Sequence, residues 1–145
     1  MVASRRLSAW VAVATGGAIG TVARYEATLR FPVRAGEFPW TILVVNLVGC
    51  VAAGVLMAIV HHWATCPSWV RPFAVIGVCG GLTTFSTWMV TDVLLARDSA
   101  GALAVLDVVV SLVAGVVAVW IGFDATRRIV GDRGSIGALD PTEAD

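Results

Sequence analysis

Long apolar stretches, separated by short polar connections, are the feature of this chain that most restricts its fold. They cover Leu7–Leu29, Trp40–Val60, Val70–Leu95 and Ala100–Phe123. Each is about as long as the roughly 20 residues that an α-helix needs to cross the hydrocarbon of a bilayer. Hydrophobic residues make up 58% of the chain and charged residues only 14%, which is too few charges for a soluble globular domain. We therefore expect an all-α membrane protein whose residues 1–125 form four transmembrane helices.

The residues at each end of the chain need a separate interpretation. Residues 126–145 mix charge, glycine and proline, a composition that predicts a disordered tail. At the other end, Arg5 and Arg6 precede an Ala-rich apolar run that could be a removable signal peptide. The apolar stretches that follow it favour its retention as a membrane helix.

Several function classes conflict with the composition. The net charge is zero and all the lysine-plus-arginine positions are arginine, so no polybasic surface indicates a nucleic-acid partner. Cys50, Cys66 and Cys79 have neither a metal spacing nor a disulfide spacing, and we interpret them as small packing residues. His61 and His62 are adjacent in a short connection, with no nucleophile or metal constellation near them. An enzyme is therefore the least favoured class.

The arginines indicate the orientation in the membrane. Four spans would place both termini and the connection after the second span on one side. That side holds Arg5, Arg6, Arg71, Arg127, Arg128 and Arg133. The opposite side holds Arg30, Arg34 and Arg97, with Arg24 near the end of the first span. This modest excess favours termini in the cytoplasm of a cell, with the chain in a bacterial inner membrane.

Small residues in the spans predict where the helices touch. Pairs spaced by four occur in the first, second and fourth spans: Gly16 and Gly20, Gly49 and Ala53, and Ser111 and Gly115. Because lipid provides little hydrophobic drive between helices, close backbone approach at such residues supplies the packing. We interpret these pairs as helix contacts.

The stretch GGLTTFSTW, residues 80–88, is unusual for a membrane span. Gly80 and Gly81 are followed by hydroxyl side chains at Thr83, Thr84, Ser86 and Thr87. Such hydroxyls usually bond back to their own helix, but so dense a cluster directly after two glycines favours a local break. Broken backbone at membrane depth is tolerated where it is buried in protein or lines a cavity. Its free carbonyls can bind a cation and its free donors can bind an anion.

Three motifs in this order resemble the Fluc/CrcB family of fluoride channels. They are GGAIGTVARY in the first span, the Asn-x-x-Gly of VVNLVG in the second, and GGLTTFSTW in the third. The resemblance covers all four spans, and its third motif is highly specific. It implies a fluoride-selective channel that exports fluoride passively, formed by an antiparallel dimer with two pores along the subunit interface.

The resemblance also implies a structural sodium ion and a set of pore residues. Main-chain carbonyls of Gly80 and Thr83 would hold the sodium ion at the dimer centre. The donors to fluoride would be neutral amide and hydroxyl groups together with aromatic ring edges. The candidates for the fluoride pore are Asn46, Thr84, Ser86, Thr87, Ser111, Phe85 and Trp88.

Two of the polar residues have a structural alternative. Asn46 could line the pore or could hydrogen-bond a neighbouring helix. Arg24 could be a fixed charge that concentrates anions in a vestibule. It could equally snorkel to the interface or satisfy the end of a helix.

The chain departs from the family pattern at three positions. Trp88 stands where the second pore phenylalanine is usual, Thr91 where a glutamate is usual, and Asp107 where a tyrosine is usual. Asp92 follows Thr91 on a different face of the helix. A carboxylate at Asp107 would repel fluoride unless it is protonated or paired, and the alternative is a solvated aspartate near the start of the fourth span.

Other functions remain open beside a complete channel. The chain could be a non-conducting partner subunit that keeps the fold and loses the pore. A proton-coupled exporter of organic cations is disfavoured because the first span has no carboxylate before Glu26. For the dimer, the arginine excess and the three departures favour pairing with an inverted paralogous subunit over self-pairing.

Overall fold

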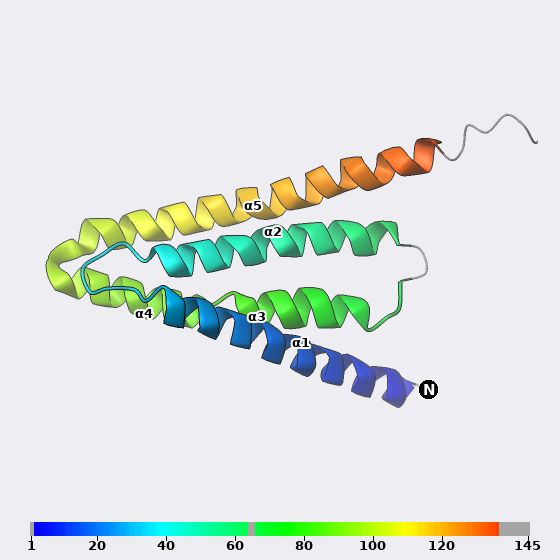
Figure 1. The fold of residues 1–145 in the computed structure, drawn as a ribbon, viewed down its shortest axis with the longest axis horizontal. Helices are drawn as coiled ribbons and strands as arrows, with labels where there is room; N and C mark the ends of the chain where they lie inside the picture. The colour runs from blue at the N-terminus through cyan, green and yellow to red at the C-terminus, as the bar shows by residue number, and fades with distance from the viewer. Residues whose placement is uncertain (1, 64–65, 137–145) are drawn as a thin grey trace, which may run out of the picture.

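The computed structural model describes residues 2–63 and 66–136, and this part of the chain is built of helices joined by short turns (Figure 1). The long helices are α1 (Val2–Arg30), α2 (Trp40–His62) and α5 (Gly101–Ile136). A segmented helix lies between α2 and α5. It consists of the π-type helix η1 (Pro72–Cys79), the short α3 (Gly80–Leu82), α4 (Phe85–Leu95) and the π-type turn η2 (Ala96–Ala100). The all-α prediction is confirmed.

Two helical stretches are long and apolar enough to cross a membrane. They are Trp40–His62 and the stretch Pro72–Val130, which contains the segmented helix and most of α5, each with a mean hydropathy of 2.6 in its most apolar window. Large apolar side chains also project outward from every long helix, including Trp10, which is 73% exposed. Such a surface suits lipid or another apolar partner rather than water.

Helix α1 crosses η1 and α3 at very close range. A Cβ atom added at Gly16 or Gly20 would overlap the backbone carbonyls of Phe73 and Val78. Gly77 meets the backbone of Gly16 from the other side. The predicted contact face at Gly16 and Gly20 is therefore confirmed, since only glycine permits this approach.

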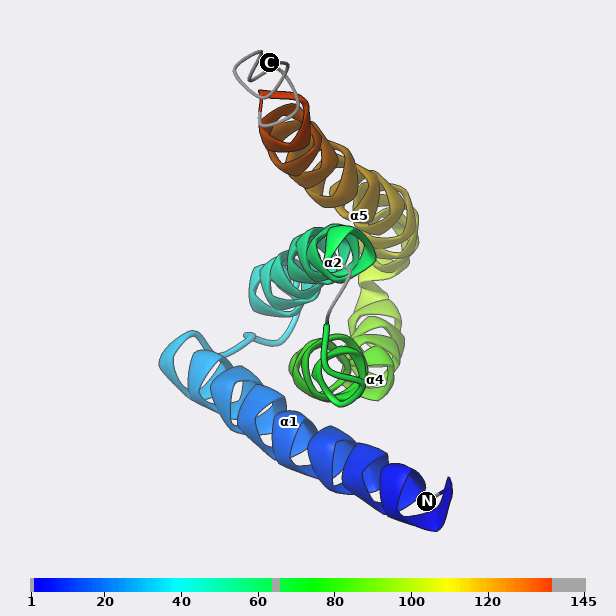
Figure 2. The same ribbon diagram turned by 90° about the vertical axis from the view of Figure 1, so that its right-hand side faces the viewer.

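Helices α2 and α5 also pack closely, but mainly through glycines that the sequence motifs did not single out. A Cβ atom at Gly54 would overlap the carbonyl of Val119. One at Gly122 would meet the carbonyl of Val51 at 2.5 Å. Viewed along the bundle, α1 lies on one side of the segmented helix, and α2 and then α5 follow on the other (Figure 2).

The end of α5 differs from the predicted disordered tail. The helix continues beyond residue 125 to Ile136, and residues 137–145 lie outside the described part. Asp124 pairs with Arg127 at 3.0 Å and with Arg128 at 2.7 Å. Charge pairs three and four residues apart stabilise a helix, which explains why the polar sequence stays helical here.

Candidate functional site

The segmented helix is interrupted between α3 and α4, where the ribbon leaves the helical path (Figure 1). Thr83 (φ −76°, ψ 153°) and Thr84 (φ −143°, ψ 121°) are extended. The predicted break in the third helix is thus present, but it lies three residues after Gly80. Gly80 and Gly81 remain helical, and Gly81 serves close packing because a Cβ there would overlap the carbonyl of Gly17. The glycines therefore do not create the break themselves.

Asn46 of α2 holds the break open. Its Oδ1 accepts a hydrogen bond from the Thr84 N–H at 2.8 Å, and its Nδ2 donates to the Thr84 carbonyl at 3.2 Å. The amide thus replaces both backbone partners that Thr84 would have in a helix. This geometry matches the structural alternative for Asn46, a bond to a neighbouring segment. An amide nitrogen carries two hydrogens, so one donor remains beyond this pair.

The break leaves the carbonyls of Gly80 and Thr83 without their usual donors. In a continuous α-helix a carbonyl accepts from the N–H four residues later. The N–H that would serve Gly80 belongs to Thr84 and goes to Asn46 instead. The N–H that would serve Thr83 belongs to Thr87 and goes to the Thr84 hydroxyl at 3.2 Å. These are the carbonyls for which the family resemblance implies sodium binding.

Arg24 satisfies the end of α3. Its Nε donates to the carbonyl of Gly81 at 3.3 Å, and the side chain is half-buried against the break. Without Arg24, the Gly81 carbonyl would have no hydrogen-bond donor at the break, as is the case for the Gly80 carbonyl. The contact agrees with the structural interpretation of Arg24 as a residue that satisfies a helix end.

The hydroxyls near the break are largely engaged with one another or with backbone. Thr84 caps α4 and its hydroxyl donates to the Thr87 hydroxyl at 3.0 Å. The Thr83 hydroxyl bonds back to the Cys79 carbonyl at 2.9 Å, and that of Thr91 to the Thr87 carbonyl at 2.8 Å. A hydroxyl has a single hydrogen, so those of Thr83, Thr84 and Thr91 are committed within the subunit.

A groove of about 240 Å³ gathers most of the predicted pore residues. Its lining includes Asn46, Thr83, Thr84, Phe85, Trp88 and Ser111. Ser86 and Thr87 follow on α4 but do not line the groove, and Ser86 is exposed. The rings of Phe85 and Trp88 meet edge to face, with centroids 5.7 Å apart. Phe85 is 70% exposed, so this aromatic pair lies at the open side of the groove.

Asp107 lies behind the groove rather than in water. Its side chain is fully buried, which rules out the solvated helix-end aspartate considered from the sequence. The Trp88 Nε1–H donates to Asp107 Oδ2 at 2.7 Å, and the Ser111 hydroxyl donates to Asp107 Oδ1 at 3.3 Å. The Ser111 hydrogen is therefore directed away from the groove, and only the Ser111 oxygen is left for other contacts.

Gly80 and Thr83 also border a second cavity of about 240 Å³, which Gly49, Ala53 and Cys79 help to line. Among the described residues no group of three or more histidine, cysteine or acidic side chains could hold a metal. A cation at this break would therefore rely on backbone carbonyls. Hard cations such as sodium accept oxygen ligands of this kind.

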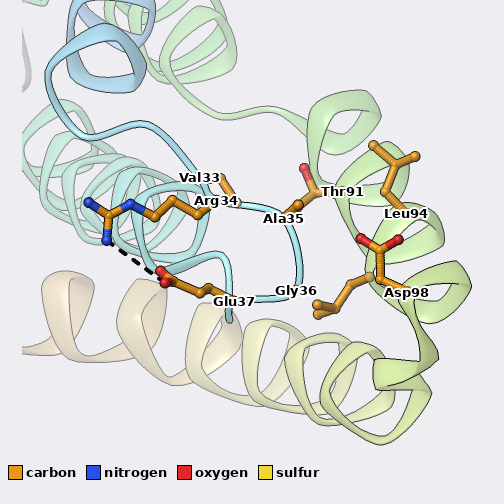
Figure 3. Close-up of a pocket in the computed structure, with 9 residues that line it drawn as sticks. Val33, Arg34, Ala35, Gly36, Glu37, Thr91, Leu94 and Asp98 are labelled. Atoms are coloured by element: carbon orange, nitrogen blue, oxygen red, sulfur yellow. Dashed lines mark ion pairs between the residues drawn. The ribbon is translucent and has the colours of Figure 1, made fainter.

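A third recess lies at one end of the bundle, where the loop between α1 and α2 approaches α4 (Figure 3). It encloses about 340 Å³ and is lined by residues 33–37 together with Thr91, Leu94, Leu95 and Asp98. Arg34 extends toward Glu37 and pairs with it at 3.8 Å. Both members of this ion pair are well exposed, so the recess holds no buried charge pair.

Comparison with known proteins places the chain in a family. Residues 11–123 match the model described as CrcB-like protein, Camphor Resistance. The chain is 41% identical over 118 residues to Fluoride-specific ion channel FluC 1 of Streptomyces coelicolor, covering 81% of this chain and 77% of the relative. It is 47% identical over 94 residues to FluC 2 of Streptomyces avermitilis, covering 60% of each chain.

A third relative matches over a similar extent of this chain. Fluoride-specific ion channel FluC of Paramagnetospirillum magneticum is 38% identical over 120 residues, which cover 81% of this chain and 94% of the relative. The matched segment contains α2, the break, the groove and most of α1 and α5. The chain therefore belongs to the CrcB-like family of membrane proteins, whose matched relatives are fluoride-specific ion channels.

Proposed function

We propose that the chain is a subunit of a passive, fluoride-selective channel in the cell membrane of a bacterium, through which fluoride leaves the cytoplasm. The main observation behind this proposal is the groove at the helix break. The matched relatives are named fluoride-specific ion channels, which supports the same function. The protein is not an enzyme. A channel must offer an ion enough contacts to replace its water, yet release it quickly.

The groove supports this role through neutral donors. Asn46, in the lining, retains one amide hydrogen beyond its bond to Thr84. The Thr87 hydroxyl, outside the lining, accepts from Thr84 and retains its own hydrogen. The exposed Phe85 ring presents an edge with partial positive charge. Trp88 contributes a second ring to the same wall. Ser86 and Thr87 lie outside the lining, and we propose that they meet the ion only where a second subunit closes the path.

We further propose an inverted dimer, each subunit of which crosses the membrane four times. The groove is open, and one of its aromatic walls, Phe85, is mostly exposed in the single subunit. A facing subunit would cover Phe85 and complete the path. Trp88 and Asp107 depart from the family pattern and would occur twice in a homodimer. We therefore favour pairing with an inverted paralogous subunit, with the homodimer as the second candidate.

A structural sodium ion at the break is the third part of the proposal. The carbonyls of Gly80 and Thr83 fit such an ion because both lose their helical donors, as Asn46 and the Thr84 hydroxyl take the two N–H groups. A bound sodium ion would balance the partial negative charges of these carbonyl oxygens and would stabilise the extended backbone. Replacement of sodium by a bulky organic cation should lower activity slowly, and full activity after prolonged sodium removal would refute the site.

Reconstitution of the purified chain in liposomes tests the function. We expect fluoride efflux that needs no proton gradient and that excludes chloride. Efflux that requires a proton gradient would instead support the exporter class. Phe85→Ile should abolish efflux while leaving assembly intact, and normal conduction by that variant would remove Phe85 from the pathway.

The choice of partner is tested with a C-terminal reporter that is active on only one side of the membrane. A single orientation, with no efflux until a second subunit is added, would support the heterodimer. Equal signals on both sides together with strong efflux from the chain alone would establish the homodimer instead.

A further inference from the structure

Two buried carboxyl groups lie behind the groove, on the helices α4 and α5. Asp92 of α4 is 6% exposed and Asp107 of α5 is fully buried. Asp92 follows Trp88 by one helical turn on the same face of α4, and Trp88 bonds Asp107, so both carboxyl groups belong to the same α4–α5 contact. Among the described residues no N–H or hydroxyl donates to either oxygen of Asp92. Asp107, by contrast, accepts from Trp88 and from Ser111.

No cation lies beside this carboxyl pair in the described part of the chain. The titratable side chain that α5 brings to this region is Asp107 itself, and the titratable side chain that α2 brings to the groove is the thiol of Cys50. Arg97 and Asp98 of η2 are exposed. The other arginines with described bonds are engaged elsewhere: Arg24 with Gly81, Arg30 with Glu26, Arg34 with Glu37, and Arg127 and Arg128 with Asp124.

Two adjacent carboxylates in such an environment cannot both stay charged. Like charges at hydrogen-bonding distance disfavour double ionisation, and burial adds the cost of desolvation. A carboxylate is only an acceptor, whereas a carboxylic acid has one O–H donor. A single proton therefore removes the repulsion between the two carboxyl groups. It makes Asp92 a hydrogen-bond donor, and it gives Asp107 a third hydrogen bond.

We propose that Asp92 and Asp107 form a proton-sharing pair, with the proton on Asp92, that holds the Trp88 ring at the groove wall. Asp92 donates to Asp107, and Asp107, as the carboxylate, accepts from Asp92, Trp88 and Ser111. Neither aspartate lines the groove, whereas Trp88 and Ser111 do. Asp92 and Asp107 are thus positioning residues: they act on the ion pathway through the indole and keep the negative charge behind it.

Infrared spectroscopy of the full chain in liposomes tests for the proton directly. At neutral pH the wild type should show the C=O stretch of a protonated carboxylic acid. Asp92→Asn should abolish this band, because the amide donates to Asp107 without a titratable proton. Asp98→Asn, which changes an exposed aspartate on η2, is the matched control and should leave the band unchanged. A wild type without the band, or a band that survives in Asp92→Asn, would overturn the proposal.

A second variant covers the case in which Asp92→Asn does not fold. In Asp107→Asn the acid on Asp92 faces an amide oxygen instead of a carboxylate, so the band should persist at a shifted frequency. An unshifted band would show that the proton does not lie between these two residues. The infrared result does not depend on conduction, so it stands apart from the proposed channel function.

Fluoride efflux supplies the positioning readout, and this arm rests on the proposed channel function. As pH rises and the shared proton is lost, the two carboxylates repel and the Trp88 bond weakens. Efflux should then fall by about tenfold, the scale of losing a hydrogen bond to a charged acceptor. Asp92→Asn should remove this pH dependence while still conducting. Identical pH profiles for wild type and Asp92→Asn would refute the positioning role, and absence of efflux from both at every pH would refute the channel function instead.

Discussion

Replacement of Asn46 tests whether one side chain keeps the helix break open. Asn46→Ala removes both hydrogen bonds to Thr84, whose side chain and backbone together are 8% exposed. A buried donor or acceptor left without a partner costs about 1–3 kcal/mol. If the backbone stays extended, the loss for the N–H and the carbonyl together is about 2–6 kcal/mol.

The chain has an alternative that lowers this cost. Without Asn46, the Thr84 N–H can return to the carbonyl of Gly80 four residues earlier, which closes the break into a continuous helix. That closure would occupy a carbonyl of the proposed sodium site and would reshape the groove. Asn46→Ala should therefore lower the thermal midpoint in detergent, abolish fluoride efflux and leave the residual protein insensitive to sodium.

Asn46→Asp is the matched control. It keeps the oxygen that accepts from the Thr84 N–H, and it replaces the Nδ2 donor by an oxygen that faces the Thr84 carbonyl. We expect an intermediate thermal midpoint and retained sodium sensitivity, since the stronger of the two contacts persists. An Asn46→Ala protein with the wild-type midpoint and wild-type efflux would refute the view that this amide maintains the break.

Three further substitutions test other parts of the structure. Gly54→Ala should destabilise the α2–α5 contact by about 1–3 kcal/mol through overpacking. Gly101→Ala, whose added methyl group meets open space, should leave the thermal midpoint unchanged. Equal midpoints for the two variants would contradict the packing argument. Thr84→Val should cost about 1 kcal/mol through loss of the cap on α4, together with reduced efflux, and unchanged efflux would separate the cap from the pathway. Arg24→Gln should lower the midpoint without changing the salt dependence of efflux; a change in salt dependence alone would restore the vestibule interpretation.

The sequence predicted the elements of this fold well because membrane helices are long and apolar. The bounds of α2 agree closely with the predicted span Trp40–Val60, the helix from η1 to α4 (Pro72–Leu95) agrees with the predicted Val70–Leu95, and the Gly16 and Gly20 contact face is confirmed. The Gly54 and Gly122 contact was missed, although Gly54 with Ala58 and Ala118 with Gly122 have the same spacing of four as the pairs that were considered.

The position of the break could not be predicted from glycine content alone. Intrinsic flexibility at Gly80 and Gly81 suggested a break there, yet the extended residues are Thr83 and Thr84. The deciding partner, Asn46, is 38 residues distant in the chain, so only the tertiary structure shows which peptide it captures. Asp107 is a similar case, because its burial follows from contacts with Trp88 on another helix.

The Thr84 residue belongs to both halves of the site, which has a consequence for how this protein can evolve. Its hydroxyl takes the Thr87 N–H and so leaves the Thr83 carbonyl free for the proposed cation, while the same side chain lines the groove and caps α4. A change at this position therefore alters cation retention and the ion path together, and neither property can drift alone. Homologues that tune selectivity should accordingly vary at Trp88 or Ser111 and preserve the residue pair at 46 and 84.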